Sequence, residues 1–102
     1  MSVAHYLYDI TMKTPLGDRR GQLSLDCENG YCHGILTLLG TKTSLHGTLD
    51  EARRCELQGE LRTLLRSLPY AASGMLLPDR LSLMLLAGGH SYAIHGQRKE
   101  LG

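Results

Sequence analysis

The sequence contains no tryptophan and no phenylalanine, and tyrosine supplies only five of its 102 residues. A core built on large aromatic rings is therefore excluded. Twenty-one leucines stand in their place, so we expect an aliphatic core in which tyrosine is the only large ring. A chain of this length has room for a single domain, residues 1–102, and for no second core.

An excess of charge of one sign is also missing, because eleven Lys and Arg face ten Asp and Glu for a net charge of +1. This balance argues against a nucleic-acid or membrane partner. No apolar run reaches the length of about 18 residues that a membrane helix needs, and residues 1–6 lack the basic and apolar segments of a signal peptide. Three cysteines, an odd number, fit a reducing compartment. We therefore expect a cytoplasmic protein.

Signature motifs of common enzyme classes are absent, including G-x-S-x-G, the P-loop, G-x-G-x-x-G and H-E-x-x-H. The strand alternation derived below places His5, His33, His46 and His95 on the outer face, where they do not converge. A catalytic site needs titratable groups that meet in a pocket. We therefore expect no catalytic residues, no metal site and no cofactor.

What the sequence does contain is a repeated Gly-x-Leu unit, whose glycines follow one another at steps of 13, 13, 12 and 15 residues. This spacing is typical of a short strand plus a turn. It predicts an all-β fold, an antiparallel up-and-down meander of about eight short strands that forms a small barrel or a flattened barrel. Glycine on the inner face permits the strong bends that closure of a small barrel requires. The five units begin at Gly21, Gly34, Gly47, Gly59 and Gly74.

Four tight turns set the expected register, with Asn29-Gly30 as the strongest signal. In each predicted hairpin, apolar residues then meet on one face and polar residues on the other. The expected pairs are Cys27 with Cys32 across Asn29-Gly30, Leu38 with Thr43 and Gly34 with Gly47 across Gly40-Thr41, Leu76 with Leu81 across Pro78-Asp79, and Leu85 with Tyr92 across Gly88-Gly89.

The two halves of the chain resemble each other. An apolar run followed by an apolar-His-Gly triplet ends each half, at Leu45-His46-Gly47 and again at Ile94-His95-Gly96. This pattern predicts an internal duplication of residues of about 5–49 and 52–97.

Cys27 and Cys32 are expected to face each other as a non-hydrogen-bonded pair, with Cα atoms about 4.5 Å apart. That distance allows a disulfide or a redox pair. The alternative is that two small inward side chains pack side by side as thiols.

Four tyrosines, Tyr6, Tyr8, Tyr70 and Tyr92, are predicted to face inward. Buried hydroxyl groups need partners, so these residues are candidates for a barrel mouth that binds a small apolar molecule. The alternative is that they plug the barrel ends with their hydroxyls in water.

The outer face of the last three predicted strands carries apolar residues where the rest of the outer surface is polar. An exposed apolar patch usually marks an interface, and a two-fold contact between identical copies is the commonest arrangement. We therefore expect a non-catalytic interaction module that acts as a homodimer, with another protein partner and a small-molecule-binding barrel as alternatives. A helical turn over Leu61–Leu68 that folds back over the patch would remove it. The patch consists of Ala71, Met75, Leu77, Met84, Leu86 and Ala93.

The segment Asp9–Gly17, followed by Gly21-x-Leu-x-Leu and Asn29-Gly30, resembles a family of small bacterial β-proteins of about this length. The resemblance implies an all-β, barrel-like domain and brings no activity with it.

Overall fold

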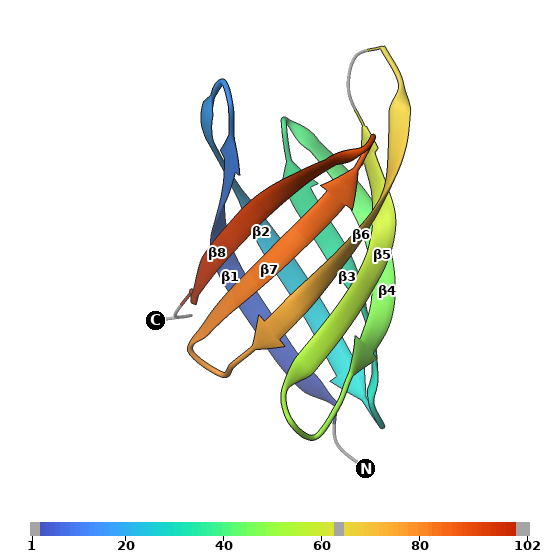
Figure 1. The fold of residues 1–102 in the computed structure, drawn as a ribbon. Coiled ribbons are helices and arrows are strands. Elements are labelled where there is room, and N and C mark those ends of the chain that lie inside the picture. Colours follow the sequence, from blue (N-terminus) through green and yellow to red (C-terminus); the bar gives the residue numbers. More distant parts are fainter. Residues whose placement is uncertain (1–2, 63–64, 100–102) are drawn as a thin grey trace.

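A computed structural model describes residues 3–62 and 65–99, and this part of the chain is all-β (Figure 1). No helix in it is long and apolar enough to cross a bilayer. Eight strands follow one another along the chain: β1 (Ala4–Thr14), β2 (Gly17–Glu28), β3 (Tyr31–Leu38), β4 (Thr41–Leu49), β5 (Arg54–Arg62), β6 (Ser67–Leu76), β7 (Arg80–Ala87) and β8 (His90–Arg98).

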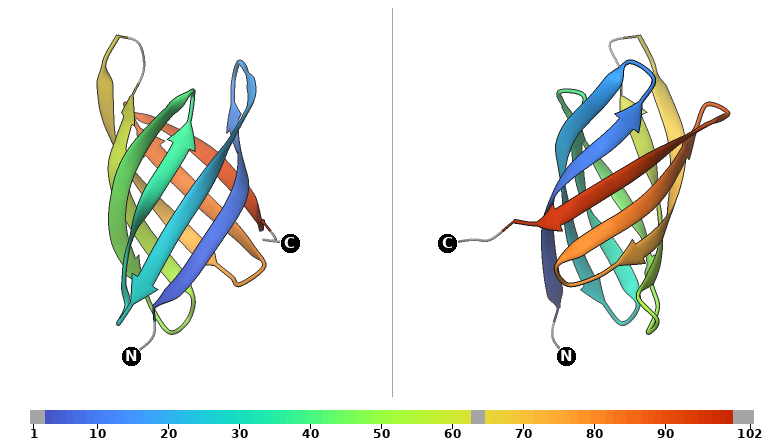
Figure 2. Two further views of the ribbon diagram at one scale, coloured as in Figure 1. Left: turned by 180° about the vertical axis from the view of Figure 1, so that it is seen from behind. Right: turned by 60° about the vertical axis from the view of Figure 1, so that its left-hand side comes forward.

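The strands form a closed antiparallel barrel in which each strand pairs with the next and β8 returns to β1. The predicted meander and its closure are thereby confirmed. The β1–β8 seam is short, running from Tyr8 opposite Arg98 to Met12 opposite Ile94. Beyond this seam the tip of the β1–β2 hairpin stands away from β8 (Figure 2). We call the end that carries the β1–β2, β3–β4, β5–β6 and β7–β8 turns the upper end, as in Figure 1.

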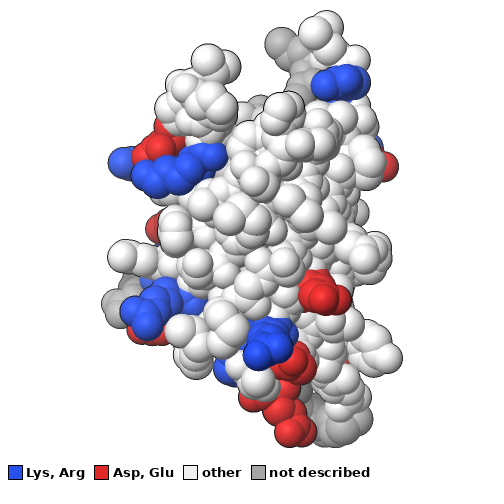
Figure 3. Space-filling view, in the orientation of Figure 1, with Lys and Arg blue, Asp and Glu red and all other residues white. Residues whose placement is uncertain are grey.

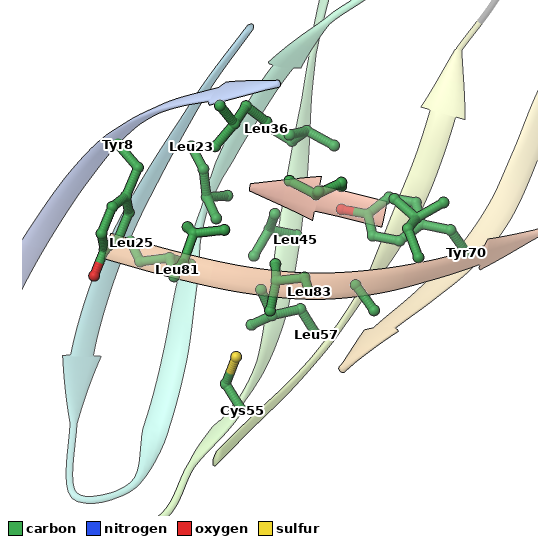
Figure 4. Close-up of a cluster of buried hydrophobic side chains, with 14 of the residues drawn as sticks. Tyr8, Leu23, Leu25, Leu36, Leu45, Cys55, Leu57, Tyr70, Leu81 and Leu83 are labelled. Carbon is green, nitrogen blue, oxygen red and sulfur yellow. The ribbon is translucent and has the colours of Figure 1, made fainter. Parts of the chain in front are cut away.

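Side chains that alternate inward along every strand fill the barrel (Figure 4). Among the described residues no polar or charged residue other than tyrosine is buried. Glycines on the inner face lie opposite larger neighbours, as where Gly34 faces Leu25 and Leu45, so large and small residues interlock. A barrel of eight strands is just wide enough for such filling.

Three of the four predicted turns have the expected register. Cys27 lies opposite Cys32, Leu76 opposite Leu81 and Leu85 opposite Tyr92. The Asn29-Gly30 turn has positive φ at both residues, 55° and 82°, as a type I′ turn requires.

The β3–β4 register was predicted wrongly, by two residues. The turn is Leu39-Gly40, with φ of 55° and 78°, and Leu38 pairs with Thr41 instead of Thr43. The predicted register would have set Gly34 against Gly47 and left a void, which a packed interior does not tolerate. The observed register seats Leu45 opposite Gly34, and this packing gain offsets the left-handed backbone of Leu39.

The alternative of a helical turn over Leu61–Leu68 is not seen in the described part of this segment, which is strand on both sides. Leu61, one residue before the end of β5, pairs with Leu68, and both side chains face the interior, so they do not cover the outer patch. Residues 63 and 64 lie outside the described part of the chain. The proposed halves coincide with β1–β4 and β5–β8, and their duplication stays a prediction.

Candidate functional site

The outer face of β6, β7 and β8 carries the predicted apolar patch at adjoining positions. Ala71 lies directly opposite Leu86, and Met84 lies opposite Ala93. Met84 is 45% exposed and Leu86 is 55% exposed, while Leu77 is half-buried. Serines lie between these apolar side chains, as where Ser73 faces Met84 and Ser82 faces Met75. An exposed apolar patch is the usual mark of an interface.

The same face is nearly free of charge, as the uncharged centre of the surface in Figure 3 shows. Within these three strands, all of which the structure describes, the outward positions hold one formal charge, Arg80 at the start of β7. Arg98, at the end of β8, pairs with the inward-facing Tyr8. The outward row of β5 differs, because it alternates Arg54, Glu56, Gln58, Glu60 and Arg62. Charge is thus depleted on one side of the barrel, as it is at the centres of protein interfaces.

The four predicted tyrosines face inward, but they do not share one mouth. Tyr6 and Tyr8 stack at the lower end, with ring centroids 6.2 Å apart. Tyr70 and Tyr92 lie in the upper half, on β6 and β8. Desolvation by burial raises the pKa of Tyr8 and of Tyr70 to about 12.

The lower end is closed by Arg53, in the β4–β5 turn. Its guanidinium lies over the Tyr6 ring at 5.4 Å, and it donates to the Tyr6 hydroxyl at 3.2 Å and to the Leu76 carbonyl at 2.9 Å. The backbone of Arg53 is in the left-handed region, at φ 69°. Tyr8 completes the seal by donating its hydroxyl to the Leu77 carbonyl at 2.6 Å. These contacts engage two donors of Arg53 and the Tyr8 hydroxyl within the protein itself.

The upper end is open. A hollow of about 890 Å³ lies between the β1–β2 hairpin and the start of β8, with Met12, Leu61, Leu68 and Tyr92 among its walls. Below it, the buried hydroxyl of Tyr70 points across the interior (Figure 4) and has no hydrogen-bond partner among the described residues. The apolar walls and the size are those of a small-molecule site.

Cys27 and Cys32 are joined in a disulfide across the β2–β3 hairpin, with Cα atoms 4.1 Å apart. The structure therefore has the disulfide and not a pair of thiols that pack side by side. Cys55 is a buried free thiol, and desolvation by burial raises its pKa to about 11, which makes it a poor nucleophile at neutral pH.

The histidines lie on the outside, as predicted. His5 contacts Asp26, and His33 Nε2 lies 3.9 Å from the other carboxylate oxygen of Asp26. Over residues 3–62 and 65–99, no group of three His, Cys, Asp or Glu side chains is arranged to hold a metal ion.

Sequence reasoning missed two arginines. Arg53 lies in the connection between β4 and β5, which is too long for its turn type, and hence the strand register, to be predicted from the sequence. Arg19 was within reach, because the inward series of Leu25, Leu23 and Gly21 continues to position 19.

Comparison with known proteins adds no relative: no family model, no curated protein and no solved structure matches this chain.

Proposed function

We propose that this protein is a non-catalytic interaction module that works as a homodimer, joined through the outer face of β6–β8. The observation that carries the proposal is the apolar patch on a side of the barrel that is nearly free of formal charge.

An uncharged patch suits a second copy of the same chain. In a two-fold contact each residue meets a symmetry-related part of the same surface, and a face with an excess of charge of one sign would bring like charges together. A standard interface removes about 800 Å² from each partner, roughly an eighth of the 6744 Å² that this barrel exposes. The outer faces of three strands out of eight can supply that area.

The filled interior supports a binding role for the outside of the barrel. The core is a continuous cluster of buried side chains, and the described residues offer no converging acid, base and nucleophile. Surface recognition therefore fits this fold better than chemistry inside it.

The test is Met84→Lys, with Ile35→Lys as the matched control. Both residues are apolar and similarly exposed, at 45% and 47%, and Ile35 lies on β3, away from the patch. Sedimentation velocity over roughly a hundredfold concentration range separates monomer from dimer by mass action. We expect a dimer for the unchanged protein and for Ile35→Lys, and a monomer for Met84→Lys.

Retention of the dimer by Met84→Lys, or equal loss in both variants, would count against this face. A monomeric unchanged protein at every concentration would reject the homodimer itself.

A further inference from the structure

One basic side chain faces the inside of the barrel wall at the upper mouth. Arg19 pairs across the β1–β2 hairpin with Met12, a buried core residue, so both belong to the inner face. Arg19 is half-buried and lines the upper hollow. Below Arg19 the inner row of β2 continues with Gly21, Leu23, Leu25 and Cys27, so a cation here stands at the edge of an apolar interior.

Arg19 has no carboxylate within ion-pair distance in the described part of the chain. The acidic residue beside it, Asp18, is already bound to Lys13, at 2.9 Å between Oδ2 and Nζ. A half-buried guanidinium with no acceptor gives up part of its hydration without compensation. A ligand that carries an anion would restore that compensation.

At the lower end of the barrel, by contrast, an arginine side chain has hydrogen-bond partners within the protein. Arg53 gives its donors to a carbonyl and a hydroxyl and covers a ring. Arg19 has none of these contacts. One end of the barrel is therefore closed by its arginine, and the other holds an arginine beside an open apolar hollow.

The charge of the upper end also favours an anion. We count the charged residues that lie in the upper turns or within three residues of an upper strand end. There are six Lys and Arg but only two Asp and Glu. The cations are Lys13, Arg19, Arg20, Lys42, Arg62 and Arg66, and the anions are Asp18 and Glu60. This excess lies against a net charge of only +1 for the whole chain, so the potential at this end is positive.

From these features we infer that the upper mouth binds a free single-chain carboxylate. The alkyl chain would lie in the hollow against Met12, Leu61 and Leu68, and the carboxylate would pair with the guanidinium of Arg19. The hollow of about 890 Å³ is within the range of ligand sites. Arginine presents a planar fork that fits a carboxylate with two parallel hydrogen bonds.

The test is calorimetric titration with decanoate of the unchanged chain, Arg19→Gln and Arg20→Gln. The two variants remove the same charge from neighbouring positions, but Arg20 faces outward, away from the hollow. We expect Arg19→Gln to weaken binding by at least about tenfold, the loss of a charge-assisted pair. Arg20→Gln should weaken it by less than about twofold, because exposed charges are screened.

Two further ligands test whether the site recognises the carboxylate charge and the length of the alkyl chain. Decyltrimethylammonium has the same chain and the opposite charge, so it should bind far more weakly than decanoate, and hexanoate should lose affinity with its buried methylenes. Unchanged melting temperatures for both variants would show that folding is intact. Because Met84 is not among the walls of the hollow, the Met84→Lys variant should bind decanoate normally.

Three results would overturn the assignment: no decanoate binding by the unchanged protein, equal losses in the two arginine variants, or equal affinity for decanoate and decyltrimethylammonium. Cosedimentation with phosphatidylglycerol vesicles, lost equally in Arg19→Gln and Arg20→Gln and without decanoate binding, would instead indicate a surface that docks on anionic lipid.

Discussion

Gly34→Ala tests the close approach of strands β2 and β3 at Gly34. A Cβ atom added to Gly34 would lie 1.8 Å from the Ser24 carbonyl oxygen and 2.8 Å from its carbon, both backbone atoms of β2. Real Cβ contacts keep 3.0 Å or more, so the two strands would have to part by about 1.2 Å. Backbone cannot yield as a flexible side chain can, and the β2–β3 hydrogen bonds on either side would break.

The size of the effect follows from those hydrogen bonds. Leaving buried backbone groups unpaired costs about 1–3 kcal/mol each, so two of them imply a loss of about 2–6 kcal/mol in unfolding free energy. Small domains have only about 5–15 kcal/mol in total. At about 4–8 °C for each kcal/mol in a domain of this size, the melting temperature should fall by at least about 8 °C.

Gly40→Ala is the control for this substitution. A Cβ atom at Gly40 meets nothing within 4 Å, although φ is +78°. Gly40→Ala should lower the unfolding free energy by about 1–2 kcal/mol, the cost of placing a residue with a Cβ atom in the left-handed region. Urea unfolding followed by circular dichroism measures both variants. A Gly34→Ala protein as stable as Gly40→Ala would refute the close approach of strands that we describe.

Tyr70→Phe should raise the unfolding free energy at pH 7 by about 1 kcal/mol, because the Tyr70 hydroxyl is buried without a partner among the described residues; a less stable variant would mean that the hydroxyl is hydrogen-bonded. The pKa of Tyr70 is raised to about 12 from 10.0, so above pH 10 the hydroxyl ionises more readily in the unfolded chain and the unchanged protein loses stability as the pH rises to 12; Tyr70→Phe should lose less stability over that window. Replacing Cys27 and Cys32 together by serine should lower the unfolding free energy by about 2 kcal/mol, from the entropy of closing a loop with a sequence separation of 5; an unchanged urea midpoint would show that the crosslink adds nothing.

The strand pattern could be derived from the sequence because it depends on short-range rules. Alternation and the Asn29-Gly30 turn placed Cys27 opposite Cys32 without any tertiary information. The turn at Leu39-Gly40 could not be found in this way. Local preference disfavours leucine at φ 55°, and the register is decided by how Leu45 on β4 fills the space beside its partner Gly34 on β3.

The candidate sites likewise separate into features that follow from strand alternation and features that depend on the tertiary structure. The outer apolar patch follows from alternation, so its residues could be listed from the sequence. The tyrosines could be assigned to the inner face but not to an end of the barrel, because that depends on where each lies along its strand. The closure by Arg53 needed knowledge of a turn whose left-handed residue has no sequence signature. The exposed mouth at Arg19 depends on the splay of the β1–β2 tip beyond the β8 seam (Figure 2).

The most direct test of the proposed homodimer uses the methionine methyl groups as reporters. Met75 and Met84 lie on the outer patch, while Met12 is buried inside the barrel. In a dilution series of protein labelled with ¹³C at the methionine methyls, the signals of Met75 and Met84 should shift along one dimerisation curve and that of Met12 should stay in place. Signals of Met75 and Met84 that do not change while sedimentation reports a dimer would contradict the account, because the copies would then meet through another surface.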